Sequence, residues 1–537
     1  MEIAHGTARR PDAPPRRTDL PALPLLLLLP PLLAAATPAP ASPQEHVPQN
    51  EDARLPAPGE VRFRVAPVLQ NWHREFGPAG TEAPLAADLD GPLLDQIHPD
   101  PSAVLSSLNE DAAALGFAPV SEEEAALGDL QVREINANAR TVAFRVDVGV
   151  LDRVALDLTV PLVRTELEPF FAYDPSGATL GGAAGAVQDP GSYFVSFGAS
   201  RDALQAMVDD GELSAAEEDQ ARALLEASGA FGTALRDRVE ENGLVPLAGT
   251  RAGAEMVSFY GQLQAGFDDF GLSLPPISLP SETTAGFLDG FFVGTLAADP
   301  LGPAARGWLA GETEIGLRLG LLRGFTREGG GFELRTTVGA RARLPFRDAN
   351  AAAFVQPSDL LGLPLGDGQR DVELSLYQDA RLGGWLLLDA TLRYGLQLSD
   401  RLVVRSRSPE RPLSLPDQVV SVDRDPGDYL RARLAPRVVL NPFLSLGLEY
   451  RFWRKSEDVY SSGNDTDVSA LSLESGQTRH RLGFGAVYRP APPEEDEAST
   501  SVPEMGFVYQ TAFSGSGGET PVAGLVTFHV TVPATVF

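Results

Sequence analysis

The feature that most constrains this 537-residue chain is a strict two-residue alternation over 142–163, VAFRVDVGVLDRVALDLTVPLV. Apolar side chains recur at every second position on both sides of a turn at 151–153, and Arg145, Asp147 and Asp157 stand between them. A period of two places successive side chains on opposite faces of an extended strand. One face of this predicted hairpin is therefore apolar, and the other carries charge.

The same alternation recurs along most of the chain. Further candidate strands are 61–76, 312–322, 332–344, 371–380, 385–398, 429–440, 443–453, 478–488, 505–513 and 522–532. Most connections alternate between short ones, such as 151–153, and long ones, namely 77–138, 174–308, 346–370, 400–427 and 458–476. Outer-membrane barrels have short periplasmic turns and long outer loops, whereas a soluble β-sandwich has no reason to show this rhythm.

The sequence therefore predicts an all-β fold. We expect a transmembrane antiparallel up-and-down β-barrel of about 12 strands (~12–14), with long, partly helical outer loops and both termini in the periplasm. The apolar face would meet lipid and the charged face would line a lumen. The candidate lumen-lining residues are Arg145, Asp147, Asp157, Glu314, Arg318, Glu333, Arg335, Arg341, Arg343, Asp389, Arg393, Arg431, Arg433, Arg437, Glu449 and Arg451. Such charges either set the solute preference of an open pore or pair across a narrow, filled lumen.

Residues 1–41 have the organisation of a secretory signal peptide. Arginines between positions 9 and 17 precede an apolar run at 23–36, and Ala39-Pro40-Ala41 provides the small residues of a cleavage site. The run is too short for a transmembrane helix and contains two prolines. We expect residues 42–60 to be a Pro-rich linker and residues 61–537 to form the barrel, exported to the bacterial outer membrane.

A long insertion at 174–308 interrupts the strand pattern. It contains a predicted helical stretch at 200–241, where Ser214 and Glu217 have the spacing of a capping box. A second helix is predicted at 103–117. The insertion is either a surface-exposed helical segment or a lid or plug over the mouth of the pore.

Composition excludes several classes of function. The formal net charge of −30 argues against a nucleic-acid partner, and the lack of cysteine excludes disulfides. None of the six histidines has the spacing of a metal motif, and His480 and His529 have no identifiable catalytic partner. Asp423, Asp425 and Asp428 form either a calcium site or a solvated acidic loop. We predict no enzyme activity, no catalytic or cofactor-binding residue, no metal and no cofactor.

Two resemblances to known proteins add to this interpretation. The terminal Phe537 resembles the C-terminal aromatic signal of outer-membrane barrels, which implies the barrel-assembly machinery as a partner during biogenesis. The segments 149–153 and 160–163, GVLDR and VPLV, resemble a hairpin of the phenol meta-pathway-associated barrel transporters, as do parts of 310–400. This resemblance implies uptake of small organic molecules, hydrophobic ones among them, and it transfers no binding residue.

The sequence thus predicts a pore or transporter for passive passage of small solutes. The alternative is a structural or surface-binding outer-membrane protein that transports nothing and acts through its long outer loops. In either case the predicted partners are the lipids of the outer membrane.

Overall fold

The computed structural model describes residues 52–211, 213–296, 304–323, 331–345, 369–463, 466–490, 503–518 and 520–535. The predicted signal peptide, residues 42–51 of the predicted linker and the terminal Phe537 lie outside these ranges.

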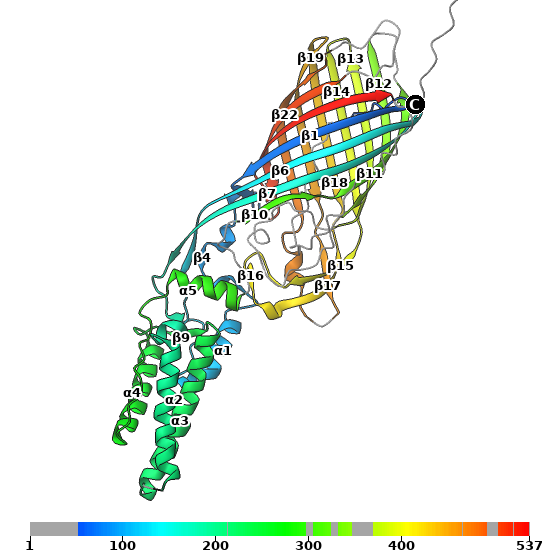
Figure 1. The fold of residues 1–537 in the computed structure, drawn as a ribbon. Coiled ribbons are helices and arrows are strands. Elements are labelled where there is room, and N and C mark those ends of the chain that lie inside the picture. The colour runs from blue at the N-terminus through cyan, green and yellow to red at the C-terminus, as the bar shows by residue number, and fades with distance from the viewer. Residues whose placement is uncertain are drawn as a thin grey trace, which may run out of the picture. The chain divides into compact units, whose positions relative to one another are not determined.

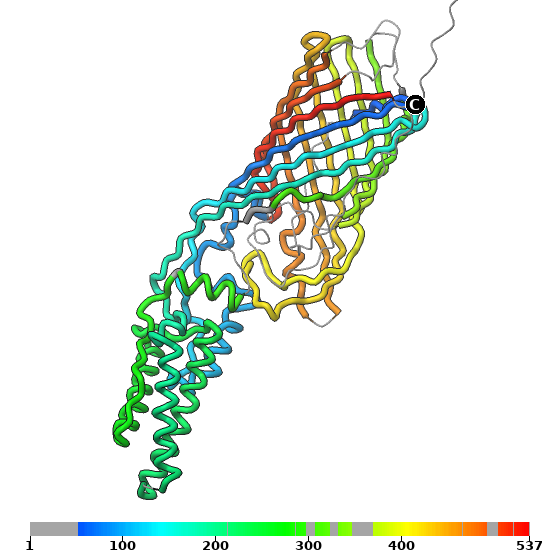
Figure 2. Tube along the Cα trace, in the orientation of Figure 1, coloured from blue at the N-terminus to red at the C-terminus, as the bar shows by residue number. Residues whose placement is uncertain are grey.

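Twelve antiparallel strands form a closed barrel in the described chain (Figures 1 and 2). They are β1 (Glu60–Trp72), β6 (Asp129–Leu151), β7 (Val154–Asp174), β11 (Thr313–Arg323), β12 (Phe332–Leu344), β13 (Asp371–Leu382), β14 (Leu386–Gln397), β18 (Tyr429–Asn441), β19 (Leu444–Lys455), β21 (Gln477–Tyr488), β22 (Glu504–Ser516) and β24 (Gly524–Thr535). Each strand pairs with the next along the chain, and β24 pairs with β1 to close the ring. The predicted barrel and its strand number are confirmed.

The two ends of the barrel differ in their connections. Tight turns join β6 to β7, β13 to β14 and β18 to β19 at one end. The start of β1 and the end of β24 lie at this same end, because Glu60 is paired with Thr535 and Val61 with Val148. We call it the turn end and the opposite end, which carries the long connections, the loop end. The predicted alternation of short and long connections is therefore present.

The loop end carries the remaining elements. The helices are α1 (Ser102–Leu115), α2 (Pro190–Asp209), α3 (Ala215–Glu240), α4 (Arg251–Asp269) and α5 (Ala285–Gly290), which a π-helical turn at Phe291–Thr295 follows. The short strands are β2 (Arg74–Phe76), β3 (Glu82–Pro84), β4 (Gly91–Pro92), β5 (Ile97–His98), β8 (Leu180–Gly182), β9 (Leu244–Pro246), β10 (Ala304–Ala310), β15 (Asp400–Arg405), β16 (Leu413–Ser414), β17 (Val419–Asp425), β20 (Val459–Ser462) and β23 (Thr520–Pro521). Short 3₁₀ turns occur at Ala87–Leu89, Leu94–Gln96, Ala183–Ala186, Pro416–Gln418 and Ser469–Ser472.

The helices share an apolar core, and we call them with this core the helical module. Leu108 of α1, Phe197 of α2, Phe231 of α3 and Tyr260 of α4 are all buried in one cluster, together with Ile135 of the long strand β6. The insertion is thus packed against the extended part of the β6–β7 hairpin. No helix in the described ranges is long and apolar enough to cross a membrane.

The predicted helix at 200–241 is two helices, α2 and α3. Helix α2 ends at Asp209 and α3 begins at Ala215, and between them Gly211 has a φ of +68°. Ser214 then starts α3 with the predicted capping box, since its hydroxyl accepts from the Glu217 backbone N–H and the Glu217 carboxylate accepts from the Ser214 N–H. This satisfies donors that a helix start leaves without intrahelical partners.

Candidate functional site: the lumen of the barrel

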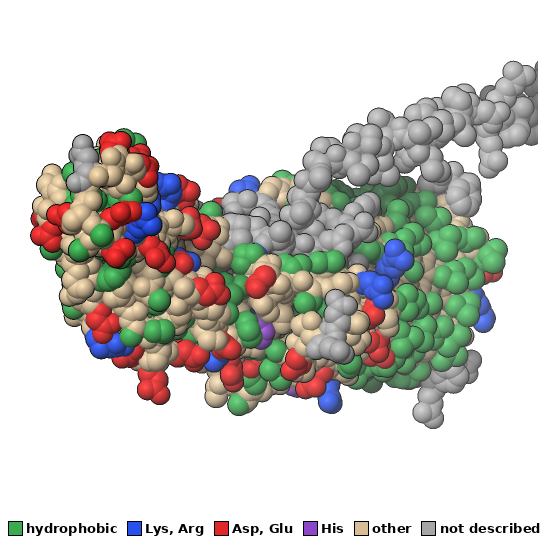
Figure 3. All heavy atoms as spheres, turned by 90° about the horizontal axis from the view of Figure 1, so that it is seen from below, with side chains coloured by type: hydrophobic (Ala, Val, Ile, Leu, Met, Phe, Trp, Pro, Cys, Tyr) green, Lys and Arg blue, Asp and Glu red, His purple; other side chains and the backbone are tan. Residues whose placement is uncertain are grey.

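The barrel exposes apolar side chains and buries charged ones. On β11, Ile315 and Leu317 are 50% and 48% exposed, whereas Glu314 and Arg318, which flank them in the sequence, are 7% and 4% exposed. A soluble protein arranges its side chains the other way round. Figure 3 shows apolar side chains gathered over the barrel, while acidic and basic ones are scattered over the helical module. An apolar outer band around a polar interior is the design of a barrel in lipid. The chain is a transmembrane β-barrel.

The long β6–β7 hairpin shows where the apolar band ends at the loop end. Up to Val142 and the opposite Leu162, the outward side chains are apolar and the lumen side is charged. Beyond this pair the outward positions become Arg140 and Arg164, and the inner positions, such as Leu167, join the apolar core of the helical module. The two faces exchange polarity because the hairpin passes from lipid into water at this height.

Inside the barrel, an ion-pair network links β6, β7, β11, β12 and β13. Arg145 on β6 contacts Asp147 at 2.7 Å and Asp157 at 3.4 Å. Arg341 on β12 contacts Asp157 at 2.8 Å and Glu314 at 3.2 Å. Asp147 and Asp157 are direct cross-strand partners, and such like charges repel. The two arginines therefore neutralise a pair that would otherwise destabilise the hairpin.

The network continues across β12, β13 and β14. The Glu373 carboxylate on β13 forms ion pairs with Arg341 at 3.7 Å and with Arg393 at 3.3 Å. Arg318 and Arg393 also lie over the ring of buried Tyr377, with their guanidinium carbons 5.6 and 5.8 Å from its centroid. An aromatic face attracts a cation, and more strongly where water is excluded. Tyr377 thus packs between cations in the middle of the lumen.

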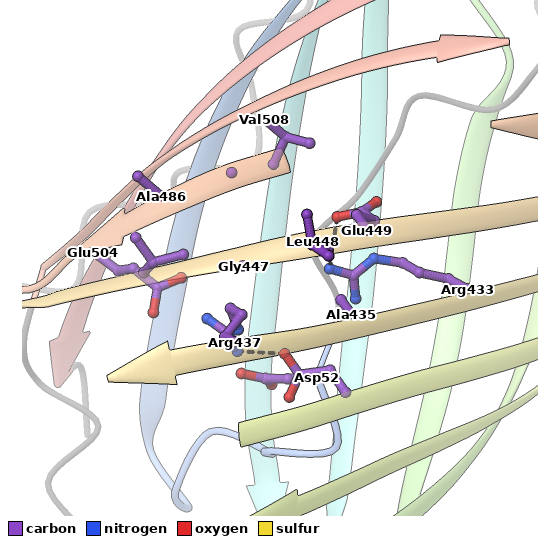
Figure 4. A pocket seen from close by; sticks show the side chains of 13 residues that line it. Asp52, Arg433, Ala435, Arg437, Gly447, Leu448, Glu449, Ala486, Glu504 and Val508 are labelled. Carbon is purple, nitrogen blue, oxygen red and sulfur yellow. Dashed lines mark hydrogen bonds and ion pairs between the residues drawn. The ribbon is translucent and has the colours of Figure 1, made fainter. Parts of the chain in front are cut away.

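A second network occupies the wall formed by β14, β18, β19, β22 and β24. The Glu449 carboxylate forms an ion pair with Arg433 at 3.1 Å and accepts a hydrogen bond from the Gln510 side-chain amide at 2.7 Å. Arg437 pairs with Asp389, and Glu504 pairs with Arg489 and lies 3.3 Å from His529. Figure 4 shows Arg433, Arg437, Glu449 and Glu504 around a small cavity, with Asp52 at its edge. Its volume of about 30 Å³ has room for one or two water molecules, roughly.

The segment before β1 lies between these networks. The Ala53 N–H donates to both carboxylate oxygens of Asp379 at 3.0 Å, and its carbonyl accepts from the Thr337 hydroxyl at 2.7 Å. Arg318 donates to the Asp52 carbonyl at 3.2 Å, and Arg62 donates to the Leu55 carbonyl at 3.0 Å. We call residues 52–58 the lumen segment. Its contacts come from strands β1, β11, β12 and β13, so it crosses the interior near the turn end.

The structure places every predicted lumen candidate on the inner face of its strand. Arg145, Asp147, Asp157, Glu314, Arg318, Arg341, Arg343, Asp389, Arg393 and Glu449 are buried, and Glu333, Arg335, Arg431, Arg433, Arg437 and Arg451 are half-buried. Most are brought together in the two networks. Arg431 instead lies over the ring of Tyr429, with its guanidinium carbon 4.6 Å from the centroid. Whether these residues contact a solute stays a prediction.

Several lumen residues were not predicted from the sequence. Arg479 and Arg481 on β21 are 4% and 1% exposed, and their alternation with His480 and Leu482 is a signal that could have found them. Tyr377 also lies at an inward position of a predicted strand. The lumen segment has no periodicity, and nothing in its composition indicates that it enters the barrel.

The loop end contains a larger cavity, of about 170 Å³, lined by residues of β15, β17 and the β19–β21 connection. Arg405 in its wall donates to the carbonyls of Leu296 and Ser414 at 2.6 and 3.0 Å, and burial lowers its pKa. Arg424 pairs with Asp400 at 2.7 Å. The cavity therefore has fixed cationic side chains beside apolar ones such as Leu471.

The acidic residues considered for calcium are each engaged separately. Asp423 pairs with Arg401 at 2.7 Å, Asp425 accepts from the Ser399 hydroxyl and Asp428 accepts from the Tyr394 hydroxyl. Within the described ranges no three His, Cys, Asp or Glu side chains are placed to hold a metal.

The two strand histidines lie on opposite faces of the barrel. His529 is buried beside Glu504, whereas His480 faces outward among Tyr450, Phe452 and Phe513.

No family model and no curated protein sequence matches this chain. Among solved structures, it is similar to an outer membrane channel from Pseudomonas putida F1, with 8% identity and a TM-score of 0.40 over 91% of this chain and 100% of that one. The toluene transporter TodX of P. putida gives 11% identity and a TM-score of 0.27, over 89% and 91%. The translocator domain of the autotransporter NalP from Neisseria meningitidis gives 8% and 0.24, over 88% and 87%. These similarities select no function for the chain.

Proposed function

We propose that this barrel is a channel for the passive passage of small solutes, and that the lumen segment and the ion pairs beside it hold it closed. The observation that carries the proposal is the position of residues 52–58 inside the barrel. The cavities that border Asp52 have volumes of only about 30 and 20 Å³. Withdrawal of the segment would join these spaces into a continuous polar path.

The contacts of the lumen segment suit a reversible closure. They include hydrogen bonds to Asp379, Thr337, Arg318 and Arg62. The buried apolar side chains of the segment, Ala53 and Pro56, are small, so its release would expose little apolar surface. Each such bond contributes a net ~1 kcal/mol, or about twice that with a charged partner. A few bonds of this size favour the closed state and still permit opening.

The charged walls favour small polar solutes. Arg341, Arg393 and Glu373 would replace part of the hydration shell of an ion or a polar molecule, as charged rings do in other pores. Hydrophobic solutes, which the resemblance to phenol-pathway transporters implies, would gain little from such walls. We therefore expect flux of polar solutes to exceed flux of apolar ones of the same size.

The test uses the absence of native cysteine. Ala53→Cys with Thr337→Cys puts one thiol on each of the two residues that are joined by the hydrogen bond from the Thr337 hydroxyl to the Ala53 carbonyl. In planar bilayers we expect no openings with the disulfide formed and openings after reduction. Ala53→Cys alone is the matched control and should not respond to the reductant. Deletion of 52–58 should give a permanently open channel.

The alternative function is a barrel that transports nothing and displays its helical module. The separate apolar core of that module, which includes Phe197 and Phe231, favours it. If neither the reduced double variant nor the deletion variant conducts ions or passes solutes, the channel proposal is wrong and this alternative stands.

A further inference from the structure

Two arginines stand side by side on the outward face of the barrel, where the apolar band ends. Arg140 on β6 and Arg164 on β7 are direct cross-strand partners. The next outward pair toward the turn end is Val142 with Leu162, and Leu69 of β1 is the partner of Arg140 on its other side. We propose that Arg140 and Arg164 bind the phosphate group of a membrane lipid at the loop end.

The two positive charges of Arg140 and Arg164 would be stabilised by a bound anion. Like charges directly opposite each other in a ladder are destabilising. Within the described ranges, neither guanidinium forms an ion pair with a carboxylate; Glu166, two residues beyond Arg164 on the same face, has Asn138 as its cross-strand partner. The same hairpin resolves its other like-charged pair, Asp147 and Asp157, with two arginines inside the lumen. On the outward face, no carboxylate of the described residues neutralises the pair, which leaves this position to an anionic ligand.

The surroundings identify that partner as a lipid. Val142 and Leu162 form the next outward pair toward the turn end and offer an apolar surface beside the two arginines. A lipid fits this arrangement, because its phosphate would meet the arginines and its acyl chains would meet the apolar pair. Trp308 of β10 is 48% exposed and precedes Leu309, the partner of Val163. Exposed tryptophan is enriched at the membrane–water interface, which places the arginines at headgroup height.

Arginine suits a phosphate at this position. Its planar guanidinium donates two parallel hydrogen bonds to phosphate oxygens and stays charged at every physiological pH. Two such groups on neighbouring strands can grip one phosphate from both sides.

The experiment compares the full refolded chain with the Arg140→Gln/Arg164→Gln double variant in nanodiscs. The probes are bisphosphorylated lipid A, the same lipid without its phosphates, and inorganic phosphate. Native mass spectrometry should show the phosphorylated lipid bound roughly tenfold or more weakly by the variant, because charge-assisted hydrogen bonds are lost. Arg133→Gln, at an exposed position farther along β6, is the matched control and should bind as the unmodified chain does.

Thermal unfolding gives a readout that a purely structural role would not move. In the lipid without phosphates, the double variant should be at least as stable as the unmodified chain, because a repulsive pair has been removed. In phosphorylated lipid the order should reverse. Equal stabilisation of both proteins by the phosphorylated lipid would overturn the proposal, and so would a full effect of inorganic phosphate alone, since that would mean a free-anion site.

Discussion

Arg341 holds carboxylates from three other strands in the buried lumen. Its partners are Asp157 on β7, Glu314 on β11 and Glu373 on β13. Removal of one member of a buried ionic group leaves the others charged and uncompensated, which is strongly destabilising. We expect Arg341→Met to lower the free energy of unfolding by about 3 kcal/mol or more, measured by urea titration in lipid vesicles.

Arg335 provides the matched control on the same strand. It pairs with Glu333 at 2.5 Å, but the two side chains are 33% and 25% exposed. Because partly hydrated ion pairs contribute little, Arg335→Met should cost less than about 1 kcal/mol. Equal losses for the two variants would contradict a stabilising role for the buried network.

The inner face of each barrel strand could be predicted at the level of single residues, and its ion pairs could not. Alternation placed Arg341 and Asp157 on the charged face because the period of a strand is fixed. Their contact joins β7 to β12, which are separated by β11 in the ring. It depends on strand register and barrel curvature, which a single sequence does not encode locally. The lumen segment escaped prediction because it pairs with side chains and has no pattern of its own.

At the scale of elements, strand β6 begins earlier than the sequence indicated, inside the connection predicted at 77–138. The alternation of 142–163 indicated the membrane part of the β6–β7 hairpin, while the strands run from Asp129 to Asp174. In the extension the outward face is polar and the inner face contains small apolar residues such as Ala137 and Ala139. The pattern therefore weakens where the hairpin leaves the lipid.

The helical module has a pH dependence of its own. Burial raises the pKa of Tyr260 to about 12 and that of Tyr193 further, and the two hydroxyls lie 3.2 Å apart. A raised pKa means that the fold favours the neutral form. The stabilisation is complete below pH 10, the ordinary pKa of tyrosine, and is lost as the pH rises through about 12.

We therefore expect circular dichroism to show loss of helix between pH 10 and 12, in step with tyrosinate absorbance. The Tyr193→Phe/Tyr260→Phe variant should be less stable at neutral pH, because the hydrogen bond to the Pro275 carbonyl is lost. Its stability should nevertheless change less over the alkaline range. An unchanged alkaline transition in this variant would assign the loss of helix to other groups.

At the scale of the whole molecule, the barrel closes without helices α2, α3 and α4. All twelve strands of the ring lie outside residues 187–277, and the ends of this stretch meet where the Ser278 N–H donates to the Ala186 carbonyl at 3.0 Å. Replacement of 187–277 by a short Gly-Ser linker should leave a barrel whose migration on a gel changes on boiling. The variant should also bind an apolar dye, because Ile135 and Leu167 lose their cover.

If boiled and unboiled forms of this variant migrate alike, helices α2, α3 and α4 are required for the barrel to assemble. The Ser214→Ala variant, which removes only the cap of α3, is the control and should still form a barrel whose migration changes on boiling, since an N-cap contributes only about 1 kcal/mol.

The pairing of β1 with β24 sets an order of events during folding. These strands come from opposite ends of the described chain, so their contact has the largest loop to close, and we expect it to form last. The lumen segment directly precedes β1 and is attached to Asp379 and Thr337 on distant strands. A chain that folds in this order can lay this segment against the open sheet before β1 pairs with β24. The lumen segment would then already lie inside the barrel when its first and last strands pair, and a newly folded channel would start in the closed state.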